Sequence, residues 1–328
     1  MPRVSVVIPC FNGADYIDAC LDSLAGQSEP DWEALVVDDK STDSSLAAST
    51  RRAAQDRRVR VLSQPVNRGV AAARNAGARE ATAPYLLFLD VDDVLEPAML
   101  AVTCDHLERH AGVVIAYTGH SYIDADGRHL GVEAGAWPWA RYLPSRYGVR
   151  KVARSVTDTG FASIYLVAAI IPSLAVIRRQ AFARTRGWDE SFGQHCEDTD
   201  MFLQLSLLGY VHFLDQPLVR YRQHAHQSTR TDGFAGQYSK LQLKWRDLQL
   251  PPAHRLTVDD AEWFRSRRFV PCEHARMGFE ALRGGRFRNA ARLLRAAARD
   301  YSPRRPPPSL ACAPRRPVRS RILAGGRR

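Results

Sequence analysis

Residues 85–93 read Tyr85-Leu86-Leu87-Phe88-Leu89-Asp90-Val91-Asp92-Asp93. The first five are apolar without interruption, which is typical of a strand that is buried on both faces of a sheet. Three carboxylates then follow within four residues. Because ligands bind beyond the carboxyl ends of the strands in parallel sheets, this stretch predicts a buried strand that ends at a binding edge.

Strand-like and helix-like segments alternate on both sides of this stretch. Strands are expected at 4–8, 34–37, 59–62, 85–89 and 113–117, and helices at 14–26, after 41–44, at 69–80 and at 97–110. This order predicts an α/β fold with a mainly parallel sheet and helices on both of its faces. No GxGxxG motif follows the first strand and no P-loop motif occurs, so any nucleotide site is of another kind.

The alternation loosens beyond residue 120. Residues 125–160 combine Trp137, Trp139, Tyr142 and Tyr147 with glycines and prolines, which indicates an irregular surface region. Such a region either shapes a binding pocket or is a long packed loop. Later elements are expected as a strand at 174–177, a helix from 197–198, and two short strands within 211–222 that are separated by a turn at 215–217.

Residues 160–177 carry no charge over 18 positions, the length of a membrane-spanning helix. Pro172 interrupts this stretch, and the residues after it are strand-like. We therefore expect two buried elements joined at Pro172 rather than a membrane helix.

Basic residues are concentrated at the end of the chain. The chain has 46 lysines and arginines against 35 acidic residues, but residues 265–328 alone hold 18 arginines and three acidic residues. The remainder is slightly acidic, and we expect no nucleic-acid binding, since a phosphate-binding groove needs its arginines on the folded surface. Three roles stay open for the arginine-rich end: contact with anionic lipid, binding of a partner protein or acidic polymer, and a solvated extension.

The six cysteines stand far apart without a CxxC pair, so neither a zinc site nor a disulfide framework is expected. Met1 is followed almost at once by the strand at 4–8, without the pattern of a signal peptide. These features predict a cytoplasmic protein.

Two acidic groups mark the ends of neighbouring strands: Asp90, Asp92 and Asp93 after one, and Asp38-Asp39 after another. Carboxylates that are crowded at the mouth of a buried strand repel one another and lose hydration, and a divalent cation compensates both effects. The expected cofactor is Mn²⁺ or Mg²⁺, which takes oxygen ligands and substrate phosphate. The alternative is that these side chains cap the next helix and are solvated.

Five motifs follow one another through residues 3–225. They read Val4-Ser5-Val6-Val7-Ile8-Pro9-Cys10-Phe11-Asn12, Val36-Val37-Asp38-Asp39-Lys40-Ser41-Thr42-Asp43, Asn67-Arg68-Gly69-Val70-Ala71-Ala72-Ala73-Arg74-Asn75, Phe88-Leu89-Asp90-Val91-Asp92-Asp93, and Gly187-Trp188-Asp189-Glu190 with Glu197-Asp198. In this order they resemble the motifs of family 2 (GT2) glycosyltransferases, which have the GT-A fold.

The resemblance implies that residues 1–230 form a GT-A catalytic domain. It says nothing of the rest, for which composition predicts a helical extension at 231–302 and a disordered tail rich in proline and arginine at 303–328. Within the extension, residues 272–282 and 287–299 are expected to pair as a helical hairpin.

The resemblance implies seven residues that bind the nucleotide sugar. Pro9 and Phe11 would line the base and ribose pocket. Asp39, with Asp38 beside it, would accept a hydrogen bond from the base. Arg68 and Gly69 would lie near the diphosphate, and Asp90 would contact the ribose. Arg74 is expected either near the diphosphate or as a structural partner within its helix.

The same resemblance implies the metal site and the catalytic base. Asp90-Val91-Asp92 matches the DxD motif, in which Asp92 would be the direct metal ligand and Asp90 a water-mediated one. His224 would approach the metal or the diphosphate, unless it is an ordinary surface histidine. Asp198 matches the base that deprotonates the acceptor hydroxyl, and the alternative is a helix N-cap.

Three further residues would contact the acceptor sugar: Trp188, Asp189 and Glu197. For Trp188, core packing is the alternative, and for Glu197 the alternative is that it only orients its neighbour Asp198.

The function expected from these motifs is inverting, metal-dependent transfer of a sugar from a nucleotide-diphosphate sugar, with a UDP-sugar as the expected donor. The acceptor would be a glycan or a lipid-linked hydroxyl. If the arginine-rich end takes the first of its three open roles, contact with anionic lipid, the protein would lie at the inner face of the cell membrane. Two alternatives remain: a sugar-1-phosphate nucleotidyltransferase, which would usually show a glycine-rich loop where Pro9-Cys10-Phe11-Asn12-Gly13 stands, and a nucleotide-binding scaffold without chemistry.

Overall fold

The computed structural model describes residues 1–133, 150–153, 156–161, 164–165, 170–193, 195–225, 227, 237, 240–241 and 243–245. All of them belong to the first of two units into which the chain divides, Met1–Arg255 and Leu256–Arg328. The four aromatic residues between 137 and 147, the expected hairpin at 272–299 and the tail lie outside the described residues. The predicted boundaries at 230 and 302 stay predictions.

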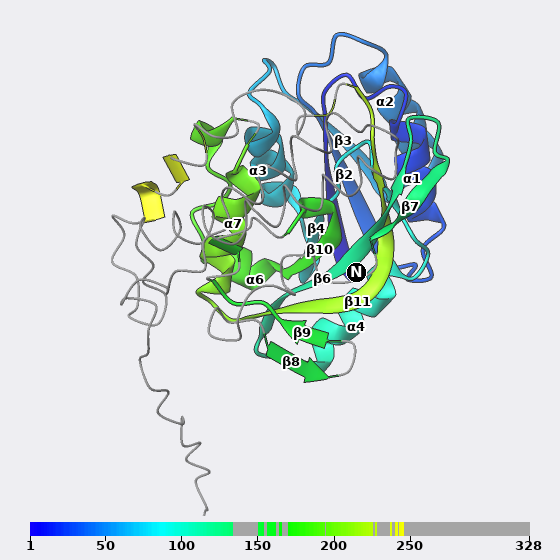
Figure 1. The fold of residues 1–328 in the computed structure, drawn as a ribbon. Helices are drawn as coiled ribbons and strands as arrows, with labels where there is room; N and C mark the ends of the chain where they lie inside the picture. The colour runs from blue at the N-terminus through cyan, green and yellow to red at the C-terminus, as the bar shows by residue number, and fades with distance from the viewer. Residues whose placement is uncertain are drawn as a thin grey trace, which may run out of the picture. The chain divides into compact units, whose positions relative to one another are not determined.

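Among the described residues, eleven strands form one sheet (Figure 1). Its main path runs β3-β2-β1-β4-β10-β6-β11-β9-β8, while β5 pairs with β11 and β7 with β6. The strands are β1 (Val4–Cys10), β2 (Trp32–Asp38), β3 (Val59–Ser63), β4 (Tyr85–Phe88), β5 (Val94–Leu95), β6 (Val113–Ile123), β7 (His129–Glu133), β8 (Arg150–Ala153), β9 (Val156–Asp158), β10 (Ala175–Arg178) and β11 (Tyr210–Arg222).

The central part of the sheet is mainly parallel, as predicted. β1 pairs in parallel with β2 and β4, β2 with β3, and β6 with β11. β10 lies antiparallel between β4 and β6, so these two strands point the same way without pairing. The carboxyl ends of β1, β2 and β4 therefore lie along one edge of the sheet, which is where the acidic motifs follow.

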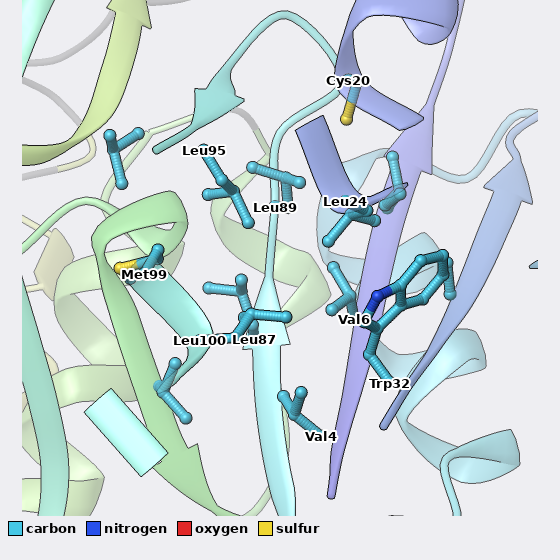
Figure 2. Close-up of a cluster of buried hydrophobic side chains, with 14 of the residues drawn as sticks. Val4, Val6, Cys20, Leu24, Trp32, Leu87, Leu89, Leu95, Met99 and Leu100 are labelled. Carbon is cyan, nitrogen blue, oxygen red and sulfur yellow. The ribbon is translucent and has the colours of Figure 1, made fainter. Parts of the chain in front are cut away.

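The helices cover both faces of the sheet, and alternating side chains of β1 explain why. Val4, Val6 and Ile8 belong to a hydrophobic cluster with α1 and α4 (Figure 2), whereas Val7 points to α3 on the opposite face. Gly77 of α3 permits this approach, because a Cβ there would lie 2.4 Å from Val7 Cγ1. The α-helices whose bounds lie within the described residues are α1 (Ile17–Ala25), α2 (Ser45–Gln55), α3 (Val70–Glu80), α4 (Met99–Arg109), α6 (Arg179–Phe182) and α7 (Glu197–Ser206).

Two expectations about the second half of the chain are wrong. β11 is one strand rather than two, because its register against β6 shifts on both sides of Pro217 where a turn was expected. Proline has no backbone N–H to donate, and at a bulge the sheet does not require one. The region expected to be irregular contains β7, β8 and β9. These strands have at most five residues, too few for a clear alternation of apolar and polar positions.

No helix among the described residues is long and apolar enough to cross a bilayer. Within the uncharged stretch, Pro172 opens a short 3₁₀ turn, η3 (Pro172–Leu174), that leads directly into β10.

Candidate active site

Two loops are tied together beyond the ends of β1 and β2. The N–H of Asn12 donates to Ser41 Oγ over 3.0 Å, and Asn12 Oδ1 accepts the N–H of Thr42 over 2.8 Å. The residues predicted to line the base and ribose pocket lie here. Pro9 is buried within β1, whereas Phe11 is 49% exposed just beyond it. The ring of Phe11 is thus accessible to a ligand, and the predicted contacts of both residues with a base and ribose stay predictions.

The carboxylate of Asp39 organises the start of α3. Asp39 is 3% exposed and accepts the N–H groups of Arg68 and Gly69 over 2.8 and 2.7 Å, and Gln64 Nε2 over 2.8 Å. Its neighbour Asp38 is also buried and accepts the N–H of Ser41 over 3.3 Å. Both oxygens of Asp39 thus have partners within the chain, and the predicted contact with a base stays a prediction.

Arg68 lies at the surface beside this turn. Its guanidinium pairs with Glu190 over 2.8 Å, and the side chains are 49% and 40% exposed. Exposed ion pairs contribute little to stability. Breaking the pair with Glu190 therefore costs little free energy, and the guanidinium of Arg68 is available to an anionic ligand.

Asp92 and His224 lie in contact, 132 residues apart in sequence. His224 Nε2 is 2.9 Å from Asp92 Oδ2, and the ring of Tyr16 packs on the imidazole with centroids 5.1 Å apart. Burial, followed by the charge of Asp90, raises the pKa of Asp92. A cation bound by this carboxylate and imidazole would offset both effects. No cluster of three or more His, Cys, Asp or Glu side chains suited to a metal occurs in the described part of the chain.

Arg222, at the end of β11, holds the acidic loop that follows β4. Its Nε donates to the backbone oxygen of Asp92 over 2.8 Å, and its N–H to Asp93 Oδ1 over 3.1 Å. Its Nη1 reaches the backbone oxygens of Asp124 and Ala125 over 3.1 and 2.9 Å. The sequence analysis missed this residue, and no local pattern could have revealed it because its partners lie about 100 residues or more away.

Arg74 joins the acidic loop to the start of α7. Its guanidinium is 3% exposed and pairs with Asp90 over 2.7 Å and with Glu197 over 3.0 Å. It also lies 4.5 Å from the centroid of the Trp188 ring. Of the two expected roles for Arg74, the structure shows the structural one, with partners that lie outside its own helix.

Asp198 follows Glu197 on the first turn of α7 and is partly buried. Burial, followed by the neighbouring carboxylate of Glu197, raises the pKa of Asp198 to about 7, against the opposing hydrogen bond from Thr199 and the charge of Arg74. A carboxyl group with this pKa is ionised in part at neutral pH and can accept a proton.

These features agree with an independent comparison of the sequence. Residues 5–184 match the family model described as Glycosyl transferase family 2. The chain belongs to this family.

A curated relative of this family 2 glycosyltransferase is the chondroitin synthase of Pasteurella multocida (strain Pm70), 28% identical over 216 residues. The match covers 66% of the present chain but 20% of that synthase, so the chain spans about one fifth of the relative's length. The prediction that the chain is a glycosyltransferase is confirmed at the level of the family.

Solved structures confirm the predicted GT-A fold. Residues 1–349 of TarS from S. aureus, in complex with UDP-GlcNAc, superpose with a TM-score of 0.60 at 16% identity, over 92% of this chain and 93% of that one. A mannosyltransferase from Pyrobaculum calidifontis, in complex with GDP-Man and Mn²⁺, gives 0.55 at 21% identity, over 92% and 76%.

The predicted acceptor residues of this glycosyltransferase have partners within the chain. Trp188 is 2% exposed, packs edge-on against Phe88 with centroids 4.9 Å apart, and has its backbone bonded on both sides by Asn75. Asp189 accepts hydrogen bonds from Ser191. The structure therefore shows the core packing that was the alternative for Trp188, and acceptor contact stays a prediction.

Proposed function

We propose that the chain transfers a sugar, with inversion, from a nucleotide-diphosphate sugar to an acceptor hydroxyl during polysaccharide assembly. One observation carries the proposal: Arg74 bridges Asp90 of the acidic loop and Glu197, the neighbour of a carboxylate whose pKa is about 7. One buried guanidinium thus joins the proposed donor-binding motif to the helix turn that carries the proposed base, 108 residues further along the chain.

Asp198 acts as the base in this proposal. A sugar hydroxyl has a high pKa, so its oxygen attacks well only when a carboxylate accepts the proton during bond formation. The new bond joins that oxygen to the anomeric carbon while the bond from this carbon to the diphosphate oxygen breaks. Attack opposite the leaving group inverts the anomeric centre, and the nucleoside diphosphate departs.

Mn²⁺ or Mg²⁺ is the proposed cofactor, held by Asp92 and His224 with Asp90 nearby. The oxygen and imidazole donors suit either ion, and one or two protein ligands leave positions for water and phosphate. When bound, the cation neutralises the charge that develops on the leaving diphosphate. We expect EDTA to abolish transfer and added Mn²⁺ to restore it, and His224→Ala to raise the Mn²⁺ concentration required.

We further propose a UDP-sugar as donor and a glycan or lipid-linked hydroxyl as acceptor, with Phe11 against the base and Arg68 and Gly69 near the diphosphate. The support is that TarS binds UDP-GlcNAc and that a curated relative is named a chondroitin synthase. Residence in the cytoplasm, at the inner face of the membrane, belongs to the same proposal.

The experiment is a panel of UDP- and GDP-sugars with Mn²⁺, scored first by donor hydrolysis and then by transfer to candidate acceptors. Asp198→Asn should abolish transfer and leave nucleotide binding nearly intact in calorimetry. Transfer that survives this substitution would refute the role of Asp198. Release of pyrophosphate from a nucleoside triphosphate and a sugar 1-phosphate would instead favour the nucleotidyltransferase, and nucleotide binding without any turnover the scaffold.

A further inference from the structure

A segment beyond the predicted catalytic domain reaches back to α7. Lys240, Leu241, Lys244 and Trp245, which we name the C-terminal clamp, are helical. Leu241 is fully buried and Trp245 is 2% exposed, and the ring of Trp245 meets that of Phe161 with centroids 5.5 Å apart. The clamp is therefore packed into the same unit as the proposed site.

The clamp is anchored on Asp200, a buried carboxylate in the first turn of α7. Asp200 is 0% exposed. Its Oδ1 accepts Trp245 Nε1 over 2.9 Å and pairs with Lys244 Nζ over 2.8 Å, and its Oδ2 accepts Gln204 Nε2 over 2.9 Å. A buried charge is tolerated only when partners replace its hydration. Two of these three partners come from the clamp.

The clamp also holds the loop that precedes α7. Lys244 Nζ lies 2.7 Å from Asp189 Oδ2, and Lys240 Nζ donates to the backbone oxygen and the hydroxyl of Ser191. Burial alone would raise the pKa of Asp189, but the hydrogen bonds from Lys244 and Ser191 lower this pKa to about 2. The Lys244 ammonium thus joins the loop and the helix at one point.

The start of α7 needs such support because of its backbone. Cys196, the N-cap of α7, has a φ of 69°, a left-handed conformation that costs free energy for a residue other than glycine. From one direction Arg74 holds Glu197, and from another the clamp holds Asp200. Asp198 lies between these two anchored carboxylates.

We infer that Lys244 and Trp245 are positioning residues for the proposed base: by bonding Asp200, they fix the first turn of α7 and hence the carboxylate of Asp198. This inference rests on the proposed function. It makes part of the C-terminal extension a component of the catalytic unit, although its residues are not expected to touch donor or acceptor.

Two substitutions remove the contacts to Asp200 by different means. Lys244→Met removes the ammonium, and Trp245→Phe removes the N–H donor while an aromatic ring stays against Phe161. We expect kcat to fall about 10- to 100-fold, the loss that a misplacement of about 1 Å produces when it arises away from the chemistry. KM for the donor should change less than kcat, because the loop that Lys244 holds meets the proposed donor site through the exposed pair of Glu190 with Arg68, and exposed pairs contribute little. Lys244→Arg keeps the charge and should restore most of kcat.

Lys240→Met is the matched control, since it removes an ammonium from the same segment without touching Asp200. Its kcat should exceed that of Lys244→Met, and thermal melting should show all four variants folded. An unchanged kcat in both Lys244→Met and Trp245→Phe, or an equal loss of kcat in Lys240→Met, would overturn the inference.

Hydrogen exchange provides a readout that does not require turnover. In Lys244→Met the amides of 197–206 should exchange faster than in the wild-type chain, while those of α1 stay unchanged. Equal exchange in α7 would overturn the inference even if the chain is an active transferase. Faster exchange in a chain that transfers no sugar would refute the proposed function and leave the anchoring of α7 standing.

Discussion

Asp198 has the clearest consequence at the scale of single residues. Because burial and Glu197 raise the pKa of this carboxyl to about 7, the basic form is lost as the pH falls through 7. The groups that face it are Glu197, Thr199 and Arg74. We expect kcat to decline about tenfold per pH unit well below pH 7, as required for one essential base. A profile from pH 5 to 9 measures this, and a rate that stays flat down to pH 5 would contradict it.

Arg74 should matter for stability as well as for the site. Arg74→Met leaves Asp90 and the buried carboxylate of Glu197 without their cation, and removing one partner of a buried ion pair costs about 3–5 kcal/mol. The free energy of unfolding in urea measures this loss. Arg79→Met is the control, because Arg79 lies on the same helix and is exposed. Equal stability of the two variants would show that the buried pairs contribute nothing.

At the scale of residues, the motifs of the sequence named side chains that the fold brings together. Asp92 and His224 lie 2.9 Å apart, and their predicted roles at a metal or diphosphate stay predictions. Arg222 and the clamp were missed because their contacts join segments far apart in sequence. Asn75 stands within a quoted motif, yet its bonds to the backbone of Trp188 span 113 residues and have no local signature.

At the scale of elements, the close packing of α3 on β1 depends on the glycine at position 77, which has no side chain. Gly77→Ala would place a Cβ 2.4 Å from Val7 Cγ1, and overpacking of this kind costs about 1–3 kcal/mol. Alanine's higher helix propensity offsets about 1 kcal/mol of this, so we expect a net loss of stability in thermal or urea unfolding. Adding Val7→Ala should relieve the clash, and strictly additive effects of the two substitutions would argue against direct contact.

The strands that are buried on both faces were predicted well. β2 and β4 were predicted from unbroken apolar runs and β1 from a run that only Ser5 interrupts, since a strand covered by helices on both sides needs apolar residues on both faces. β7, β8 and β9 were missed because they are short, and β11 was divided because Pro217 is ordinarily incompatible with a continuous strand. The position of β10 between β4 and β6, and its antiparallel direction, depend on pairing with those strands. The sequence of its own four residues does not indicate either.

At the scale of the whole molecule, the charge distribution gives a testable prediction. Residues 302–328 contain eight arginines and no acidic residue, and each basic residue near an anionic membrane contributes about 1 kcal/mol. If this end contacts the membrane, the full chain will sediment with phosphatidylserine vesicles at low salt and a chain ending at Tyr301 will not. Phosphatidylcholine vesicles are the control. Equal sedimentation of the two chains would eliminate the membrane contact and leave the partner-binding and solvated alternatives.

The position of β10 also constrains how the protein can fold during its synthesis. β4 and β6 have been synthesised once the chain reaches residue 123, but the strand that separates them ends at Arg178. Until then each keeps an edge of unpaired backbone groups, and such edges invite wrong pairing. Nascent chains halted between these two points should therefore be the ones that chaperones bind and proteases cleave most. Extension past Arg178 should reduce both, and extension past Arg222 should end them, because the other edge of β6 pairs with β11.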